Sequence, residues 1–238
     1  MHRRFLGPLV LTPAALAAGA GLAVWFWKRW GYPVRTHERD VQRAPDPPIP
    51  EPTGASSDRE AQSVEEGTGP QFHRTYRVTI RNAGVAPEEL IGHIQADIQT
   101  FVPNELARFE KVKGDASSFT VGDEFDIHIT SPWDGPVRVI DQDASSFTFG
   151  TLEGHLEAGQ IRFSAGPHDA FEGGLRFTIE SWARSRDALV DLAYDDVGLA
   201  KAAQQAMWTF FCQQVVDASG GERVGEVEVS TERESESP

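Results

Sequence analysis

The sequence predicts an α+β domain in which a curved antiparallel sheet wraps around a long C-terminal helix. Three observations support this fold class. A strand pattern followed by a helix opens the domain, a series of short strands with turn signals follows, and an apolar stripe at helical spacing closes it. The chain has 238 residues, and we expect the domain at 71–217, which is long enough to bury a substantial core.

An apolar run precedes this domain. Residues 5–27 contain no charged side chain, and the basic pair Lys28 and Arg29 follows them. About 20 apolar residues in a helix cross the hydrocarbon core of a bilayer. We therefore predict a membrane anchor within 1–30. The alternative is a signal peptide cleaved near the small residues at 15–17, but the apolar run continues well beyond that point.

The basic residues that flank the run predict its orientation. Arg3 and Arg4 precede it, whereas five basic residues follow it closely: Lys28, Arg29, Arg35, Arg39 and Arg43. The positive-inside rule places the more basic side in the cytoplasm. The sequence thus predicts a single-pass membrane protein whose C-terminal domain is cytoplasmic and whose first partner is the lipid bilayer.

Two segments outside the domain have the composition of disordered chain. Residues 31–70 read as a basic juxtamembrane stretch followed by a proline-rich linker. Residues 218–238 form an acidic tail for which we expect disorder, with a basic protein as its possible partner. Valines at 224, 227 and 229 leave open a short edge strand within that tail.

Composition argues against several classes of function. The formal net charge is −14, which disfavours nucleic acid as a partner because phosphates demand basic patches. The histidines at 128, 155 and 168 have no metal-ligand spacing, and the single cysteine, Cys212, lies in an apolar helical stripe. No nucleophile elbow, phosphate-binding loop or dinucleotide fingerprint occurs. We therefore expect no metal, no cofactor and no catalytic residue.

Periodicity assigns the elements within the domain. Tyr76, Val78 and Ile80 alternate with polar residues as in a half-buried strand, and Pro87 opens a helix that Pro103 ends. Further strands are expected near 125–129, 137–140, 147–149, 160–163 and 175–179, and the closing helix at about 187–217.

This order of elements resembles the helix-grip fold of the START-like superfamily, which includes lipid-transfer domains, hydrophobic ligand carriers and polyketide cyclases. The segment from Phe149 to Gln160, with its Gly-Thr-Leu-Glu-Gly-His stretch, is similar to the centre of an uncharacterised bacterial and plant family within that superfamily. The strand from Phe177 to Trp182 and the helix that contains Gln204 are also similar. The resemblance implies a cavity between sheet and helix but no particular activity.

The predicted ligand-binding residues are of two kinds. His155 and Glu153, with Glu157 nearby, lie in the Gly-Thr-Leu-Glu-Gly-His stretch and have the chemistry to handle a proton. The alternative is a hairpin turn that the histidine caps. The others are aromatic residues that either line a pocket or fill an ordinary core: Phe149, Phe177, Trp182, Trp208 and Phe211.

Three functions remain open from the sequence. The first is a membrane-tethered module that binds a hydrophobic small molecule or lipid. The second is an interaction or structural domain with a collapsed cavity. The third is a cyclase-like or hydrolase-like enzyme, whose polar groups would be His128, His155, Glu153, Arg138 and Arg162. We favour the first of these and expect binding rather than catalysis.

Overall fold

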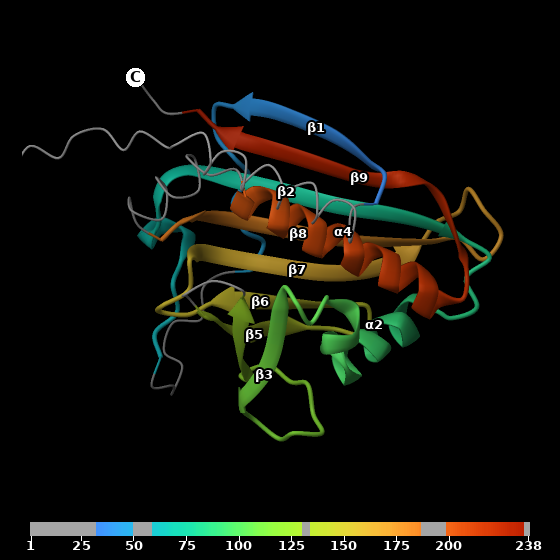
Figure 1. The fold of residues 1–238 in the computed structure, drawn as a ribbon, viewed down its shortest axis with the longest axis horizontal. Coiled ribbons are helices and arrows are strands. Elements are labelled where there is room, and N and C mark those ends of the chain that lie inside the picture. The colour runs from blue at the N-terminus through green and yellow to red at the C-terminus, as the bar shows by residue number, and fades with distance from the viewer. Residues whose placement is uncertain (1–31, 50–58, 130–133, 187–198, 236–238) are drawn as a thin grey trace, which may run out of the picture.

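The computed structural model describes residues 32–49, 59–129, 134–186 and 199–235. Within these residues, a single nine-stranded sheet has the order β1-β9-β2-β8-β7-β6-β5-β4-β3 (Figure 1). All neighbouring strands are antiparallel except β1, which pairs with β9 in parallel. The strands are β1 (Val34–Val41), β2 (Thr68–Arg81), β3 (Ala107–Lys113), β4 (Glu124–Ile129), β5 (Asp134–Gln142), β6 (Ser146–Thr151), β7 (Glu157–Pro167), β8 (Leu175–Ser185) and β9 (Glu222–Glu234).

Helices cover one face of this sheet. α2 (Pro87–Ala96) and α4 (Leu199–Ser219) lie against the same face, and the sheet curves around α4 (Figure 1). Two short 3₁₀ helices, η1 (Val64–Glu66) and η2 (Ile98–Phe101), complete the described elements. The predicted α+β class, with a curved sheet and a C-terminal helix, is therefore confirmed. The start of the predicted closing helix, 187–198, lies outside the described residues.

The predicted elements follow from local chemistry. In β2, Tyr76, Val78 and Ile80 are buried, as alternation requires when one face of a strand meets the core. Pro87 occupies the first turn of α2, followed by two glutamates that favour the positive end of the helix. Asp97 then adopts φ −154°, so the predicted helix divides into α2 and η2 before Pro103.

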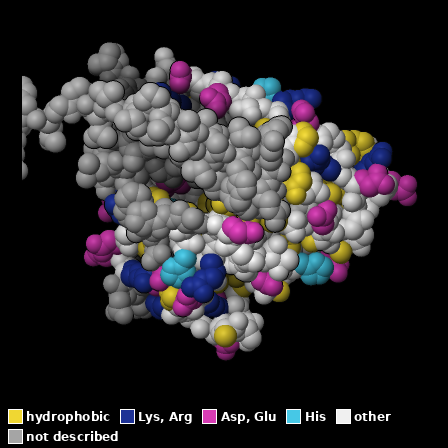
Figure 2. Space-filling view, in the orientation of Figure 1, with side chains coloured by type: hydrophobic (Ala, Val, Ile, Leu, Met, Phe, Trp, Pro, Cys, Tyr) yellow, Lys and Arg dark blue, Asp and Glu magenta, His cyan; other side chains and the backbone are white. Residues whose placement is uncertain are grey.

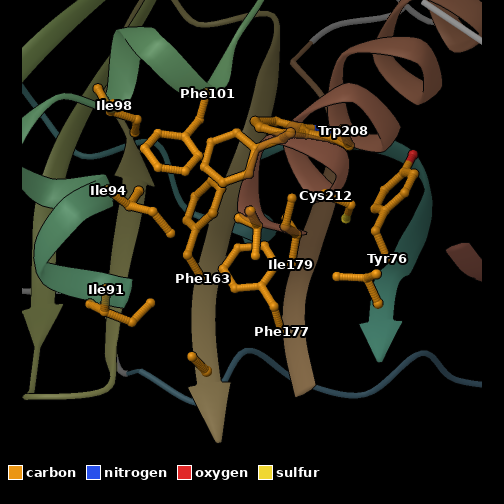
Figure 3. Close-up of a cluster of buried hydrophobic side chains, with 14 of the residues drawn as sticks. Tyr76, Ile91, Ile94, Ile98, Phe101, Phe163, Phe177, Ile179, Trp208 and Cys212 are labelled. Carbon is orange, nitrogen blue, oxygen red and sulfur yellow. The ribbon is translucent and has the colours of Figure 1, made fainter. Parts of the chain in front are cut away.

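Aromatic rings fill the space between α4 and the sheet (Figure 3). Phe211 of α4 lies 5.8 Å from Phe177 of β8 and 5.3 Å from Phe163 of β7, measured between ring centroids. All three side chains are completely buried. This cluster fixes the helix on the sheet through apolar burial, at roughly 2 kcal/mol for each fully buried large side chain.

The predicted disorder of the acidic tail 218–238 is wrong for Glu222–Glu234. These residues form β9, which lies between β1 and β2 rather than at an edge. Val227 and Val229 are buried in the core. Arginines on other elements neutralise part of the acidic charge: Arg39 pairs with Glu232, Arg81 with Glu222 and Arg184 with Glu234. Composition alone misses this strand because its partners are distant in sequence.

The described parts of the predicted juxtamembrane stretch and disordered linker at 31–70 are likewise folded. Val34–Val41 forms β1, and the strand β2 already begins at Thr68. On the sheet face opposite α4, the Gln71 amide donates to the Pro45 carbonyl at 2.8 Å, and the Gln160 amide donates to the Ile49 carbonyl at 2.6 Å. Described residues of 31–70 therefore belong to the folded domain.

The predicted anchor at 1–30 lies outside the described residues. Within the part of the chain that the structure describes, no helix is both long enough and apolar enough to cross a membrane. On the face shown in Figure 2, acidic and basic side chains of the described residues are intermingled rather than gathered by sign.

Candidate functional site: a pocket between α2 and the β3–β4 loop

Four of the predicted ligand-binding aromatics lie in the hydrophobic core. Phe149, Phe177 and Phe211 are no more than 1% exposed, and Trp208 is 7% exposed. They contact one another directly or through Phe163, which lies 5.6 Å from the Trp208 ring and 6.2 Å from the Phe149 ring. These side chains therefore fill the centre of the domain.

Trp182 lies apart from these four. It projects from the sheet face opposite α4, where its ring stacks on His73 at 5.3 Å with an interplanar angle of 22°. Its indole nitrogen is buried and has no hydrogen-bond partner. The side-chain period of two along a strand explains the separation, because Trp182 is an odd number of residues from Phe177.

His155 and Glu153 lie in the turn between β6 and β7. Nδ1 of His155 accepts a hydrogen bond from the backbone N–H of Glu157 at 2.9 Å, so the ring caps the turn. Burial lowers the pKa of His155, which favours the neutral ring that this hydrogen bond requires. Glu153 is exposed. The Glu157 carboxylate lies 3.6 Å from Arg74 of β2 and accepts a hydrogen bond of 3.3 Å from Gln204 of α4.

The polar groups considered for an enzyme do not converge. Arg138 forms a buried ion pair with Glu124 at 3.0 Å, and Arg162 donates to the Ser146 hydroxyl at 2.8 Å. The His128 ring lies 3.2 Å from the carboxylate of Glu110. None of these side chains lines either of the two cavities described here. Among the described residues, no cluster of histidine, cysteine and acidic side chains has the geometry of a metal site.

A cavity of about 460 Å³ lies between the α2–η2 segment and the loop that joins β3 to β4. We call it the α2–β3 pocket. Its lining residues are Gly92, Gln95, Ala96, Asp97, Ile98, Gln99, Phe109, Lys111, Ala116, Ser117, Ser118, Phe119 and Phe125. Its volume lies in the range of small-molecule sites, about 300–1,000 Å³.

Aromatic rings form the apolar part of this pocket. Phe119 lies 5.8 Å from Phe125, and the Phe109 ring lies 6.4 Å from Phe149. Phe149, which the sequence predicts as a ligand residue, does not line the pocket but supports its aromatic wall from the core. Phe109, Phe119 and Phe125 line the pocket but are not among the ligand-binding residues that the sequence predicts.

Gly92 opens the helical wall of the pocket. It lies in the interior of α2, where glycine costs about 1 kcal/mol relative to alanine. A Cβ atom added there would meet no heavy atom within 4 Å, so no close contact explains the glycine. An exposed glycine in the interior of this helix is the sequence signal that could have revealed the pocket.

One turn further along α2, Gln95 supplies an unused polar group. Its Nε2 atom is buried without a hydrogen-bond partner, while its Oε1 atom accepts a long bond of 3.4 Å from Gln142. Buried donors without partners are costly and rare in folded proteins. The α2–β3 pocket therefore combines aromatic surface, bare helix backbone and a donor that lacks an acceptor.

Lys111 holds the loop that closes the pocket. Its Nζ atom donates to the carbonyls of Asp115 and Ser118 at 2.6 and 2.7 Å and pairs with Asp123 at 2.6 Å. Burial acts to raise the pKa of Asp123, but Lys111 and the backbone N–H of Thr120 lower it overall. The lysine charge is thus satisfied within the protein.

Comparison with solved structures gives several remote likenesses. A hypothetical protein from Helicobacter pylori is 10% identical, with 61% of this chain and 86% of that chain covered and a TM-score of 0.45. Norcoclaurine synthase from Thalictrum flavum, in complex with dopamine and hydroxybenzaldehyde, is 11% identical over 70% and 97% of the two chains, with a TM-score of 0.43.

The di-domain ARO/CYC protein StfQ from the steffimycin biosynthetic pathway is 8% identical over 66% of this chain and 52% of that chain, with a TM-score of 0.46. Identities and TM-scores this low carry no inference about function. The search of curated proteins gave no match.

A family model, by contrast, covers most of the sequence. The family described as Domain of unknown function (DUF1990) matches residues 50–214, a range that holds the α2–β3 pocket and strands β2 to β8. β1 and β9 lie outside the matched range. The chain belongs to the DUF1990 family.

Proposed function

We propose that this protein is a ligand-binding helix-grip domain that holds a hydrophobic small molecule in the α2–β3 pocket. The observation that carries the proposal is the pairing of Gly92, which leaves the helix wall open, with the unpartnered donor of Gln95. A ligand would bury its apolar surface against the phenylalanines and accept one hydrogen bond from Gln95. Its chemical class is a largely apolar, uncharged molecule with one oxygen acceptor.

The position of the pocket supports binding rather than catalysis. A general acid or base must lie within hydrogen-bond reach of the reacting group. Asp97 lines the pocket, but its carboxylate accepts a hydrogen bond from the Thr100 hydroxyl at 2.7 Å, and the Lys111 charge is paired. The central aromatic residues are mutually packed, so a ligand is held at the side of the core instead of within it.

We propose further that the apolar run at 5–27 tethers this domain to the cytoplasmic face of a membrane, where a hydrophobic ligand is concentrated. Membrane fractionation and a C-terminal reporter fusion test this part separately. Recovery of the full chain in the soluble fraction would refute the membrane tether, whereas the pocket proposal would be unaffected.

The pocket is tested by three substitutions in the full chain. Gly92→Trp fills the open space, whereas Gly92→Ala adds only a methyl group and stabilises α2 by about 1 kcal/mol. His93→Trp is the matched control, because the His93 side chain is 50% exposed on the same helix. Native mass spectrometry of each purified protein measures the bound small molecule.

We expect a bound molecule in the wild type, in Gly92→Ala and in His93→Trp, and its loss in Gly92→Trp with the melting temperature preserved. Gln95→Leu should weaken retention about tenfold, the effect of one lost hydrogen bond of roughly 1.4 kcal/mol. Retention of the molecule by Gly92→Trp, or absence of any bound molecule from the wild type, would refute the pocket.

A further inference from the structure

A second cavity, of about 290 Å³, lies between α4 and the strands at the other side of the sheet. We call it the β1–β9 groove. Its lining residues are Thr36, Glu38, Arg39, Asp40, Phe72, Arg74, Tyr76, Gln204, Gln205, Val229, Thr231 and Arg233. It shares no residue with the α2–β3 pocket, and it depends on β1 and β9, which extend the sheet beyond the range of the family match.

Strand register orders the residues on the floor of this groove. Phe72 of β2 pairs with Arg233 of β9, which pairs with Asp40 of β1. The next row of the same face is Arg74, Thr231 and Glu38, and the third is Tyr76, Val229 and Thr36. Gln204 and Gln205 of α4 line the groove from the helix side.

Two guanidinium groups of the floor lie near the same aromatic ring. The Arg74 guanidinium is 4.6 Å from the centre of the Phe72 ring, and that of Arg233 is 6.0 Å from the same ring. Arg74 is held by a hydrogen bond of 2.9 Å to Gln204 and lies 3.6 Å from the carboxylate of Glu157. Arg233 makes no ion pair with any described residue, so its charge is available to an external anion.

Two carboxylates border these cations on the neighbouring strand. Glu38 and Asp40 are exposed on β1, and neither makes an ion pair with a described residue. Adjacent strands are about 4.8 Å apart, and β9 lies between β1 and β2, so the carboxylates lie one strand spacing from Arg233 and two from Arg74. A simple anion would be repelled by the carboxylates, and a simple cation by the arginines.

We propose that the β1–β9 groove binds a zwitterionic small molecule of the phosphoethanolamine type. Its oxyanion lies at Arg233 of β9, with Arg74 one strand further along the floor, because guanidinium forks suit phosphate oxygens. Its ammonium group, about 5 Å away, lies at Glu38 and Asp40. The ligand is either the free compound or the headgroup of a lipid, since both present the same two charges.

Calorimetric titration of the full chain tests this assignment with three probes: phosphoethanolamine, inorganic phosphate and ethanolamine. We expect phosphoethanolamine to bind at least tenfold more tightly than either fragment. Arg233→Gln should weaken its binding at least tenfold. Glu38→Gln should reduce the preference for phosphoethanolamine over phosphate to less than about threefold. A tenfold change corresponds to about 1.4 kcal/mol.

Arg77→Gln is the control, because Arg77 lies on β2 with its side chain on the opposite sheet face. Its affinity should equal that of the wild type, and thermal melting should show that all variants are folded. A fourth probe, the short-chain lipid dihexanoyl phosphatidylethanolamine, separates the two sources. If the short-chain lipid binds more tightly than phosphoethanolamine, the ligand is a lipid headgroup. If it binds more weakly, the ligand is the free compound.

The zwitterion site is overturned if phosphate binds as tightly as phosphoethanolamine, or if Arg233→Gln leaves the affinity unchanged. It is equally overturned if no probe binds. None of these results bears on the α2–β3 pocket, because the variants and probes differ from those that test it.

Discussion

His73 of β2 and Glu232 of β9 join neighbouring strands on the sheet face opposite α4, with 3.1 Å between Nδ1 and Oε2. The other ring nitrogen of His73 lies 2.7 Å from the carboxylate of Glu180 on β8. Ionised carboxylates only accept hydrogen bonds, so both contacts require a doubly protonated imidazole. Arg39 of β1 pairs with the same Glu232, and alternating charges thus cross four adjacent strands.

This arrangement predicts a pH-dependent stability. Burial lowers the pKa of His73, but Glu180 and Glu232 outweigh burial, and the pKa is raised above its ordinary 6.5. A raised folded-state pKa stabilises the protein fully below the unfolded value, and the stabilisation is lost as pH rises through the folded value. His73→Gln should therefore lower the free energy of unfolding by about 1–2 kcal/mol in mild acid and by less in alkali.

Urea unfolding of wild type and His73→Gln at a series of pH values measures this difference. His37→Gln provides the control, because His37 is exposed on β1. A difference between His73→Gln and wild type that stays constant from mild acid to alkali would contradict the charged state of the imidazole.

The acidic C-terminal segment should be essential for folding. Truncation after Gly221 removes β9 and with it the buried Val227 and Val229, and it leaves the edges of β1 and β2 unpaired. We expect this truncation to abolish the cooperative thermal transition, which is measured by circular dichroism. Truncation after Ser235 retains β9 and should melt like the full chain. Equal melting of both truncations would show that β9 contributes nothing.

Gly159 of β7 should not tolerate a side chain. Its φ is +150°, and an added Cβ would lie 1.9 Å from the carbonyl oxygen of Trp182 on β8. Gly159→Ala should therefore cost about 2–3 kcal/mol of unfolding free energy through backbone displacement. Gly166→Ala on the same strand meets nothing within 4 Å and should change stability by less than about 0.5 kcal/mol. Similar effects at the two positions would contradict the close approach of β7 and β8.

Arg138 should prove to be structural. Its pair with Glu124 has side chains that are each 5% exposed, so removal of one partner leaves a buried charge. Glu124→Gln should cost about 3 kcal/mol, and the double replacement of both residues by methionine should cost less. The exposed pair Arg43 and Asp46 offers a comparison, where Asp46→Asn should cost under about 0.5 kcal/mol. Denaturant unfolding measures all three variants, and a double replacement costlier than the single one would contradict this account.

The sequence by itself determined the elements whose stabilising partners are local. The alternation from Tyr76 to Ile80 predicts β2, and Pro87 with its following glutamates predicts the start of α2. The apolar stripe that ends near Val216 predicts the part of α4 that packs on the sheet. These signals are readable because the side-chain period of a helix or strand is a property of the segment itself.

The candidate pocket was only partly predictable. The sequence marks Phe149 and its aromatic neighbours as apolar, but whether rings fill a core or line a cavity depends on how elements meet. Gly92 carried a signal of its own, since a glycine in a helix interior requires a reason. Nothing in the sequence around His155 distinguishes a ligand-binding residue from the turn-capping residue that the structure shows.

Only the tertiary structure decided that the polar segments Val34–Val41 and Glu222–Glu234 form strands. Arg39 and Glu232 are separated by 193 positions in the sequence, yet their pairing helps to join β1 to β9. Neither segment has enough apolar surface to order itself. β1 becomes a strand because β9 satisfies its backbone hydrogen bonds, and β9 becomes a strand because β1 and β2 both pair with it. The composition of a segment shows how much apolar surface it can bury by itself. It does not show which distant strands will pair with its backbone in a sheet.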